Sequence, residues 1–444
     1  MVRFINCSLL LISLCFSGFS QESNTQKLNR FFDSLAVNHQ TMGSFAIAKN
    51  GKIVFNRVIG YSEVKKFKKR VADTNTRYNI GSVSKMFTAS MIFQLIDEDQ
   101  LSLKTTLDDY FPDVPNAKDI TIEHLLEHKS GLYDVTNDNE DREWITRPHS
   151  REEMLEKITK GKIHFSPGAE TRYNNSGYIL LGYILEKITQ LTYNENLQSR
   201  ICSRIGLRNT YSPLNNHLKK NEARPYNYVL GWEKIKDIYS PNDTGADNIL
   251  STPSDLIIFN DALLNGKLIS KGSQEAMLTF KEGNEGRGIY KSQFYQYTAY
   301  GHDGDTYGIH STVQGFPAEK FSIAYCINGE VYPHNGILLA MFKIWYEAPY
   351  SIPSFNEYLI RKKDLKVYTG RYYNKEADVT MTITRRGTTL IAKESGSHLK
   401  MRLYALNNQH FRISQKEIDI EFKAGNRQFV LTQDGSTLVF EKVE

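Results

Sequence analysis

Residues 81–97 read Gly-Ser-Val-Ser-Lys-Met-Phe-Thr-Ala-Ser-Met-Ile-Phe-Gln-Leu-Ile-Asp, and the part from Ser84 onward has the composition of a long helix. Its apolar side chains occupy most of the circumference, and a helix that is apolar nearly all round is buried. The stretch therefore predicts a helix at the centre of a folded domain, preceded by the short polar motif Gly81–Lys85.

This polar motif could supply a nucleophile. Ser82 and Lys85 are three residues apart, so on a helix they share a face. A serine at a helix start has backbone N–H groups and the positive dipole end nearby, which favours developing negative charge. Its hydroxyl becomes nucleophilic once a base such as a neighbouring lysine removes the proton. Alone, S-x-x-K is a weak signal, and the alternative is that Ser82 caps the helix while Lys85 is solvated.

The segments on either side of the helix predict an antiparallel sheet. Residues 44–55 indicate a hairpin with Asn50-Gly51 at its turn. The pattern from about 105 to 290 is mostly helical, and strand patterns then return. A sheet interrupted by helices in this way predicts an α/β (α+β) fold with an inserted helical lobe. The other predicted elements are helices over 23–38, 177–188 and 336–346 and strands over 293–300, 310–316 and 321–328.

The C-terminal part of the chain has a different pattern. Pro349 and Pro353 indicate a linker, and short alternating strands with glycine-containing turns follow from about residue 365. We expect a small all-β domain here, a partial barrel or a sandwich. The predicted strands cover 379–384, 389–392, 410–413, 418–422, 429–431 and 438–440.

The first twenty residues have the pattern of an export signal. Arg3 supplies the positive start, an apolar run follows, and small residues lead to a cleavage site after Ser20. Acylation of Cys15 is the less favoured alternative. The run is short for a membrane span, so we expect no transmembrane span in the mature protein, which would be periplasmic or secreted. The predicted domains are 1–20, signal; 21–346, the main α/β domain; 347–364, linker; and 365–444, β-barrel-like.

Charge and cysteine content limit the possible partners. The net charge is +5 over 444 residues, and 65–70 is the one dense basic run, so a nucleic-acid partner is not expected. We expect a small-molecule or peptide substrate, and a protein partner stays unassigned. Outside the signal, the cysteines are Cys202 and Cys326. They could form one disulfide or remain two buried thiols.

Two further motifs carry polar side chains. Tyr173-Asn-Asn175 lies in a loop before the helix at 177, where a tyrosine and an amide could project into a cleft. The alternative is that Asn175 or Ser176 caps this helix and Tyr173 only packs. His302-Asp-Gly304 lies where a strand of the later sheet is expected to begin, and glycine there allows close approach of a backbone or ligand. The alternative is a glycine-rich turn with a surface histidine.

Together and in this order, the three motifs resemble those of the serine β-lactamase and penicillin-binding-protein family. The likeness is greatest to its class C branch and to related esterases and D-amino-acid peptidases, which carry S-x-x-K, Y-x-N and K-T-G or H-x-G. Residues 125–132, Leu-Leu-Glu-His-Lys-Ser-Gly-Leu, and Phe165-Ser-Pro-Gly168 are similar to flanking family patterns. The resemblance spans about residues 25–346, and the C-terminal β domain looks like an accessory module.

The resemblance implies a mechanism without a metal or another cofactor. Ser82 would attack a carbonyl and form an acyl-enzyme, with Lys85 and Tyr173 sharing the general-base work. A cation beside Tyr173 would favour its phenolate. Asn175 would orient Lys85 and hold the substrate amide, and the backbone N–H groups of Ser82 and Asp305 would form the oxyanion hole. Water would then release the acyl group.

The third motif departs from the lactamase pattern in its charge. His302 replaces a lysine, so a full positive charge is not guaranteed at neutral pH. Asp303 and Asp305 flank Gly304 and would oppose a substrate carboxylate if they faced the cleft. We therefore hypothesise an esterase or peptidase that favours neutral or amine-bearing substrates and has weak β-lactamase activity at most. The alternatives are a β-lactamase or D,D-carboxypeptidase proper, or an inactive binding module.

A pair of histidines raises a zinc alternative. His124 and His128 in His-Leu-Leu-Glu-His could share a helical face. A catalytic zinc site also needs a third protein ligand and an open position. The helix is expected to be short, with Thr121 as its N-cap and Gly131 near its end. We therefore favour a structural helix here.

Overall fold

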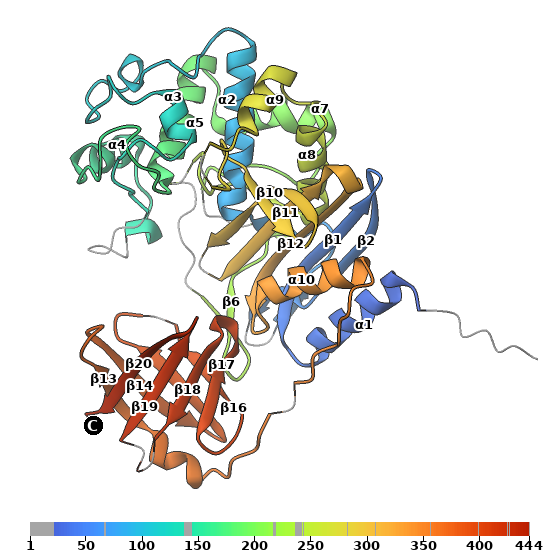
Figure 1. Ribbon diagram of the computed structural model, residues 1–444, viewed down its shortest axis with the longest axis vertical. Helices are drawn as coiled ribbons and strands as arrows, with labels where there is room; N and C mark the ends of the chain where they lie inside the picture. The colour runs from blue at the N-terminus through green and yellow to red at the C-terminus, as the bar shows by residue number, and fades with distance from the viewer. Residues whose placement is uncertain are drawn as a thin grey trace, which may run out of the picture.

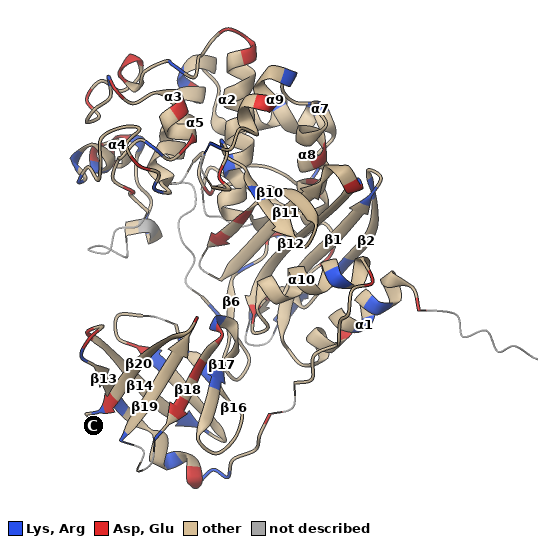
Figure 2. Ribbon diagram, in the orientation of Figure 1, with Lys and Arg blue, Asp and Glu red and all other residues tan. Residues whose placement is uncertain are grey.

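The computed structural model describes residues 22–65, 68–136, 144–215, 219–235, 242, 244–281, 283–306, 308–355, 357–397, 399–423, 425 and 427–443. An antiparallel sheet with helices on both faces is followed by a separate β-barrel (Figure 1). The predicted fold class is confirmed. Acidic and basic residues are interspersed over the helical lobe, the sheet and the barrel (Figure 2).

The central sheet contains strands from both the beginning and the end of the main domain. Its strand order is β2-β1-β12-β11-β10-β9, and β6 extends it by pairing in parallel with β12. The predicted hairpin is present, and Asn50 and Gly51 at its turn have φ values of 52° and 72°. The bounds are β1 Thr41–Lys49, β2 Lys52–Ile59, β6 Tyr226–Tyr228, β7 Trp232–Lys234, β9 Tyr290–Phe294, β10 Tyr297–Thr306, β11 Ile309–Phe316 and β12 Phe321–Glu330.

Side-chain size alternates along the central strands and sets what packs on each face. In β1, Phe45 and Ile47 lie in the core cluster under α1 (Asn24–Val37) and α10 (His334–Trp345). Ala46 and Ala48 lie in the cluster on the other face. Small residues on that face let α8 (Pro253–Leu264) pack closely on the sheet, because side chains alternate between faces along a strand.

The helical lobe buries α2 (Ser84–Asp97), as predicted. Residues 84–95 are all buried, and the ring of Phe87 stacks on Phe259 of α8 at 3.6 Å between centroids. α5 (Asn175–Thr189) packs beside α2. The other helices of the lobe are α3 Ile122–Leu126, α4 Arg151–Lys160, α6 Tyr193–Leu197, α7 Ser203–Ile205 and α9 Lys271–Met277.

The strand predicted over 293–300 is wrong, and the third motif therefore occupies a different position in its strand than expected. The segment 293–300 is not continuous, because Tyr295 has a φ of 53° and separates β9 from β10 in a tight hairpin. Residues 302–305 consequently lie in the second half of β10 instead of at a strand start. Their register partners on β11 are residues 310–313.

The C-terminal region forms a closed eight-stranded barrel, a definite form of the expected partial barrel or sandwich. The sequence prediction missed β13 (Gly370–Asn374) and β16 (Met401–Ala405). The barrel contacts the β6–β7 hairpin, where Glu233 pairs with Arg386 and Lys400. The remaining strands are β14 Val379–Arg386, β15 Thr389–Glu394, β17 His410–Ile413, β18 Ile418–Phe422, β19 Gln428–Gln433 and β20 Ser436–Lys442.

The structure tests only some of the predictions about domain limits, the signal segment, membrane spans and cysteines. α10 ends at Trp345 and a 3₁₀ helix begins at Asp364, while the domain limits themselves stay predictions. The predicted signal and its cleavage after Ser20 lie outside the described residues. In the described part of the chain, no helix is long and apolar enough to cross a membrane. Cys202 and Cys326 are both free and buried, so the disulfide alternative is wrong.

Candidate active site

Ser82 lies in a 3₁₀ turn, η1 (Gly81–Val83), directly before α2. Strand β10 passes so close to this turn that a Cβ on Gly304 would lie 2.0 Å from the carbonyl oxygen of Ile80. The backbone nitrogen of Asp305 would lie 3.1 Å from a Cβ on Gly81. Glycine at 304 therefore brings the backbone of Asp305 beside the nucleophile turn, where an oxyanion hole is expected.

Three side chains form hydrogen bonds with the hydroxyl oxygen of Ser82. The Nζ of Lys85 donates to Ser82 Oγ at 2.9 Å, and the hydroxyl of Tyr173 donates to the same atom at 2.6 Å. Ser82 Oγ in turn donates to Asp247 Oδ1 at 2.8 Å. The structure therefore brings Ser82, Lys85 and Tyr173 together and adds a carboxylate. The alternative of a solvated Lys85 is wrong, because this lysine is fully buried.

Asp247 is the residue that sequence reasoning missed. It lies in the loop before β8 (Leu250–Ser251), and 14% of its side chain is exposed. Its Oδ1 also lies 3.3 Å from Lys85 Nζ, which donates to the Ala246 carbonyl as well. No recognisable spacing marks an aspartate 165 residues from the serine it contacts, so only the fold reveals it.

The carboxylate changes the protonation of its neighbours. Burial lowers the pKa of Lys85, but Asp247 and Tyr173 more than offset this and raise it above its ordinary value. Burial raises the pKa of Tyr173, and the lowering effect of Lys85 is too small to reverse this. The resting site therefore holds an ammonium and a neutral phenol. The expectation that the cation would favour a Tyr173 phenolate is wrong for this state.

His302 is neutral and presents an acceptor. Its Nδ1 lies 2.5 Å from the carbonyl oxygen of Asp303. Since a carbonyl can only accept, Nδ1 must carry the proton and Nε2 keeps a lone pair. Burial and then Lys85 lower its pKa to about 3. Nε2 is buried without a partner among the described residues, so the surface-histidine alternative is wrong.

The two aspartates of the third motif have their carboxylates engaged elsewhere. Asp303 accepts from Thr312 and, at 3.3 Å, from Gln314, and burial raises its pKa. Asp305 pairs with His310. These contacts leave Asp247 as the carboxylate that touches the serine. The sequence interpretation had expected Asp303 and Asp305 to oppose a substrate carboxylate, on the condition that they faced the cleft.

Asn175 lies at the start of α5 but has other partners than expected. Its Nδ2 donates to Thr136 Oγ1 at 2.6 Å and to Asp134 at 3.4 Å. The Nζ of Lys85 hydrogen-bonds to Ser82 Oγ, to the Ala246 carbonyl and to Asp247 Oδ1 rather than to Asn175. Its Oδ1 is buried and unpartnered among the described residues. The helix is capped by Asn174, so the alternative caps Asn175 and Ser176 are wrong.

The histidine pair has separate structural partners. α3 ends at Leu126, so His128 lies beyond the helix, with a φ of 54°. His128 Nδ1 accepts from the Asn174 backbone at 3.0 Å, and its ring lies 4.5 Å from that of Tyr173. His124 belongs to the capping box at Thr121. His128 thus packs against Tyr173 and helps to place its hydroxyl.

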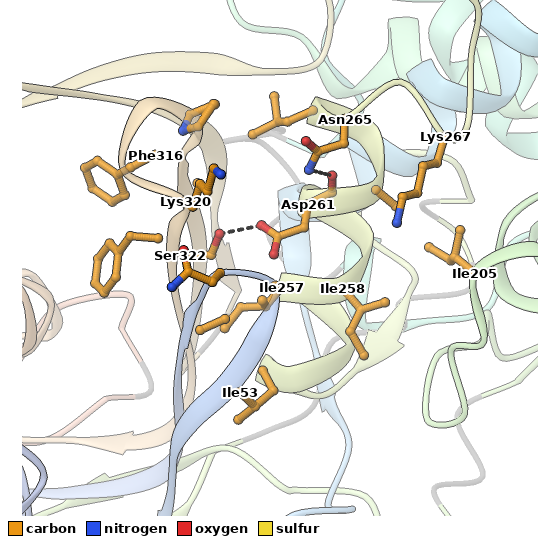
Figure 3. A pocket seen from close by; sticks show the side chains of 18 of the residues that line it. Ile53, Ile205, Ile257, Ile258, Asp261, Asn265, Lys267, Phe316, Lys320 and Ser322 are labelled. Atoms are coloured by element: carbon orange, nitrogen blue, oxygen red, sulfur yellow. Dashed lines mark hydrogen bonds between the residues drawn. The ribbon is translucent and has the colours of Figure 1, made fainter.

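A separate cavity of about 990 Å³ lies elsewhere, between α8 and the turns that join β1 to β2 and β11 to β12 (Figure 3). In it, Asp261 accepts a hydrogen bond from Ser322. Its lining contains no residue of the three motifs. The cavity is therefore distinct from the site around Ser82.

A serine that accepts hydrogen bonds from a buried lysine and a tyrosine, on such a sheet-and-helix scaffold, defines a serine hydrolase. The family model described as Beta-lactamase matches residues 28–343, and the chain belongs to this family.

Known relatives extend this likeness. Penicillin-binding protein 4* of Bacillus subtilis (strain 168) is 25% identical over 94% of this chain and 98% of its own length. Teichoic acid D-alanine hydrolase of Staphylococcus aureus is 26% identical over 60% of this chain and 62% of its own length. D-amino acid amidase from Ochrobactrum anthropi SV3 is 22% identical, with a TM-score of 0.60 over 69% of this chain and 91% of its own. The last likeness shows a shared fold.

Proposed function

We propose that the protein hydrolyses esters or amides of amine-bearing acyl groups, with D-aminoacyl groups as the first candidates, through an acyl-enzyme on Ser82. The observation that carries this proposal is the carboxylate of Asp247 at the nucleophile, 2.8 Å from Ser82 Oγ. A substrate ammonium is the natural partner for a carboxylate in a partly buried site, whereas a substrate carboxylate would be repelled.

Other groups of the site support the same preference. His302 Nε2 and Asn175 Oδ1 are unpartnered acceptors among the described residues. Both would accept from N–H groups of a substrate, and neither can donate to a carboxylate. The neutral His302 also does not supply the cation that a lysine would bring to this position.

The arrangement suggests how substrate binding prepares the serine. A substrate ammonium beside Asp247 would offset the negative charge that raises the pKa of Lys85 and of Tyr173. With its pKa lowered, one of these groups could release its proton to solvent and then accept the Ser82 proton as the oxygen attacks the carbonyl. The backbone N–H groups of Ser82 and Asp305 would stabilise the oxyanion, and the same base would return its proton to the leaving group. Attack by water would release the acyl group.

The names of two similar proteins point the same way. One is a D-alanine hydrolase and the other a D-amino acid amidase, and a D-amino acid amide carries an α-ammonium group. The D configuration in the proposal rests on these names. We further propose export after cleavage near Ser20, with a hydrolase domain over 21–346 and an accessory domain over 365–444. No nucleic-acid or protein partner is part of the proposal.

The test compares substrates that differ only in the amine. D-alanine p-nitroanilide and its N-acetyl derivative share one leaving group, and L-alanine p-nitroanilide tests the configuration. We expect the free D-amine to be preferred at least tenfold in kcat/KM and to give an acyl-enzyme that Ser82→Ala lacks in mass spectrometry. Faster turnover of a chromogenic cephalosporin than of the D-amine would favour a β-lactamase. Absence of acylation by every substrate would favour a binding module.

A further inference from the structure

A second cluster of ionisable side chains lies where β10, β11 and β12 meet the start of α10. It consists of Asp305, His310, Glu330 and His334. Asp305 and His310 face each other in the register of β10 and β11, and His334 opens α10. Four separate elements of the domain thus each contribute one residue, so the cluster is held by the fold and not by a single loop.

Glu330 orients both histidines. Its Oε2 accepts from His310 Nε2 at 3.0 Å, and its Oε1 lies 2.8 Å from His334 Nδ1. The two imidazole rings stack at 4.4 Å with an angle of 15° between their planes. A carboxylate that holds the second nitrogen of a histidine fixes the ring and raises its basicity, which is the usual arrangement behind metal-binding histidines.

Three residues of the cluster place donor atoms close together. With one nitrogen of each ring on Glu330, His310 Nδ1 and His334 Nε2 remain for a further ligand. One donor atom from each of Asp305, His310 and His334 lies within 4.8 Å of the other two. Donors around a tetrahedral zinc ion stand about 3.4 Å apart. The Asp305 side chain is 65% exposed, so its carboxylate is free to adjust its position.

We propose that Asp305, His310 and His334 bind one Zn²⁺ ion, with water in the fourth position. Two imidazoles and a carboxylate are ligands that zinc accepts. In the absence of the ion, His310 Nδ1 and Asp305 share a proton, and binding would displace it to solvent. Zinc adds two positive charges where Asp305 and Glu330 supply two negative ones, so the cluster can accommodate the ion without an uncompensated charge.

Such an ion would brace one side of the active site without entering the acyl-transfer chemistry. It would tie the end of β10 to β11 and to α10. The backbone nitrogen of Asp305 is the one that lies beside Gly81. The inference rests on side-chain geometry alone and does not depend on the substrate proposed for Ser82.

The test uses the full-length protein, stripped of metal with a chelator and titrated with zinc sulfate by calorimetry. We expect one Zn²⁺ per chain at micromolar affinity or tighter, and a Co²⁺ form with the visible absorption of a tetrahedral site. His334→Gln and Asp305→Asn should lose this binding. Glu330→Gln should weaken it by about 10- to 100-fold, as loss of such an orienting partner does.

His124→Gln is the matched control, since it removes a histidine from the other histidine pair of the domain. It should bind zinc like the wild type. Far-UV circular dichroism and Ser82 acylation in the absence of zinc should show that His334→Gln is folded. The proposal is overturned if wild-type protein takes up no zinc at micromolar concentration, if folded His334→Gln binds as well as wild type, or if His124→Gln loses binding.

Discussion

Two regions of this chain treat buried polar groups in opposite ways. Around Ser82 the fold buries a lysine completely and leaves acceptors on His302 and Asn175 without partners among the described residues. In the barrel, the described buried residues are apolar except Asn374 and Thr389. Buried polar groups cost stability unless they are paired. The polar groups around Ser82 thus lower the stability of the fold but serve the chemistry of the site. The apolar interior of the barrel carries no such cost.

From this comparison we expect the region around Ser82 to determine activity and the barrel to contribute mainly to stability. Changes around Ser82 should alter rates far more than folding, and changes inside the barrel should do the reverse. Four substitutions test this separation, and they are ordered by the free energy expected from each.

The largest effect should come from Ser82→Ala. Loss of the hydroxyl removes the acyl-enzyme route, and kcat/KM should fall by roughly 10⁴-fold or more. Steady-state hydrolysis with the free-amine anilide measures the loss, and mass spectrometry should show no acyl adduct. The midpoint of urea unfolding should stay close to that of the wild type, and a large drop in it would mean that Ser82 is needed for folding.

Phe429→Ala should be the largest change in the barrel. Phe429 is fully buried and packs on Phe422, Phe440 and Tyr372. Truncation should cost about 3–5 kcal/mol in free energy of unfolding. Far-UV circular dichroism in urea measures the cost.

The same variant also tests whether the barrel is independent of the site. The three tryptophans, Trp144, Trp232 and Trp345, lie outside the barrel, so their fluorescence reports on the hydrolase region. We expect acylation of Ser82 within twofold of wild type under native conditions. A tenfold loss of acylation in folded protein would show that the barrel supports the site, and the contrast between the regions would fail.

Asp247→Asn should give a smaller effect that depends on the substrate. The free-amine anilide should lose about 10- to 100-fold in kcat/KM, equivalent to roughly 1.4–2.7 kcal/mol, while its N-acetyl derivative should lose little. Asp261→Asn is the matched control, because that aspartate lies in the separate cavity. Equal losses on both substrates would remove Asp247 from substrate selection.

The pH profile of the same variant gives a second readout. Asp247 raises the pKa of Lys85, so deprotonation of this lysine requires higher pH when the carboxylate is present. Without the charge, the pKa of Lys85 should fall and the acid limb of kcat/KM for the N-acetyl substrate should move to lower pH. A shift to higher pH, or none, would contradict a role of Asp247 in holding the lysine proton.

The parts of the fold and of the site that could be predicted from the sequence are those marked by short, local sequence patterns. Ser82, Lys85 and Tyr173 belong to short motifs, and α2 has a strong apolar pattern that the structure reproduces over the same residues. Strands β13 and β16 were missed although buried and more accessible positions alternate along most of each strand. Their five-residue length and few β-branched residues made the pattern weak.

Other features could not be predicted from short motifs at all. Asp247 and the Glu330 cluster depend on contacts between segments far apart in sequence, which only the sheet and its loops bring together. The phenolate expected on Tyr173 was wrong because burial and Asp247 act on the tyrosine together with Lys85. The charge of a buried group depends on all of its neighbours, and a motif specifies only some of them.

The smallest effect should come from the contact between the two regions. Glu233 on β7 lies 3.7 Å from Arg386 and 3.9 Å from Lys400 of the barrel, and all three side chains are substantially exposed. Exposed ion pairs contribute about 0–1 kcal/mol because water and salt screen them. Glu233→Ala should therefore lower unfolding stability by less than about 1 kcal/mol and leave hydrolysis unchanged. A loss that is larger and that disappears in high salt would show that charge pairing couples the barrel to the hydrolase domain. In that case Phe429→Ala would need to be measured again in high salt, since the barrel could then influence Ser82 through β7.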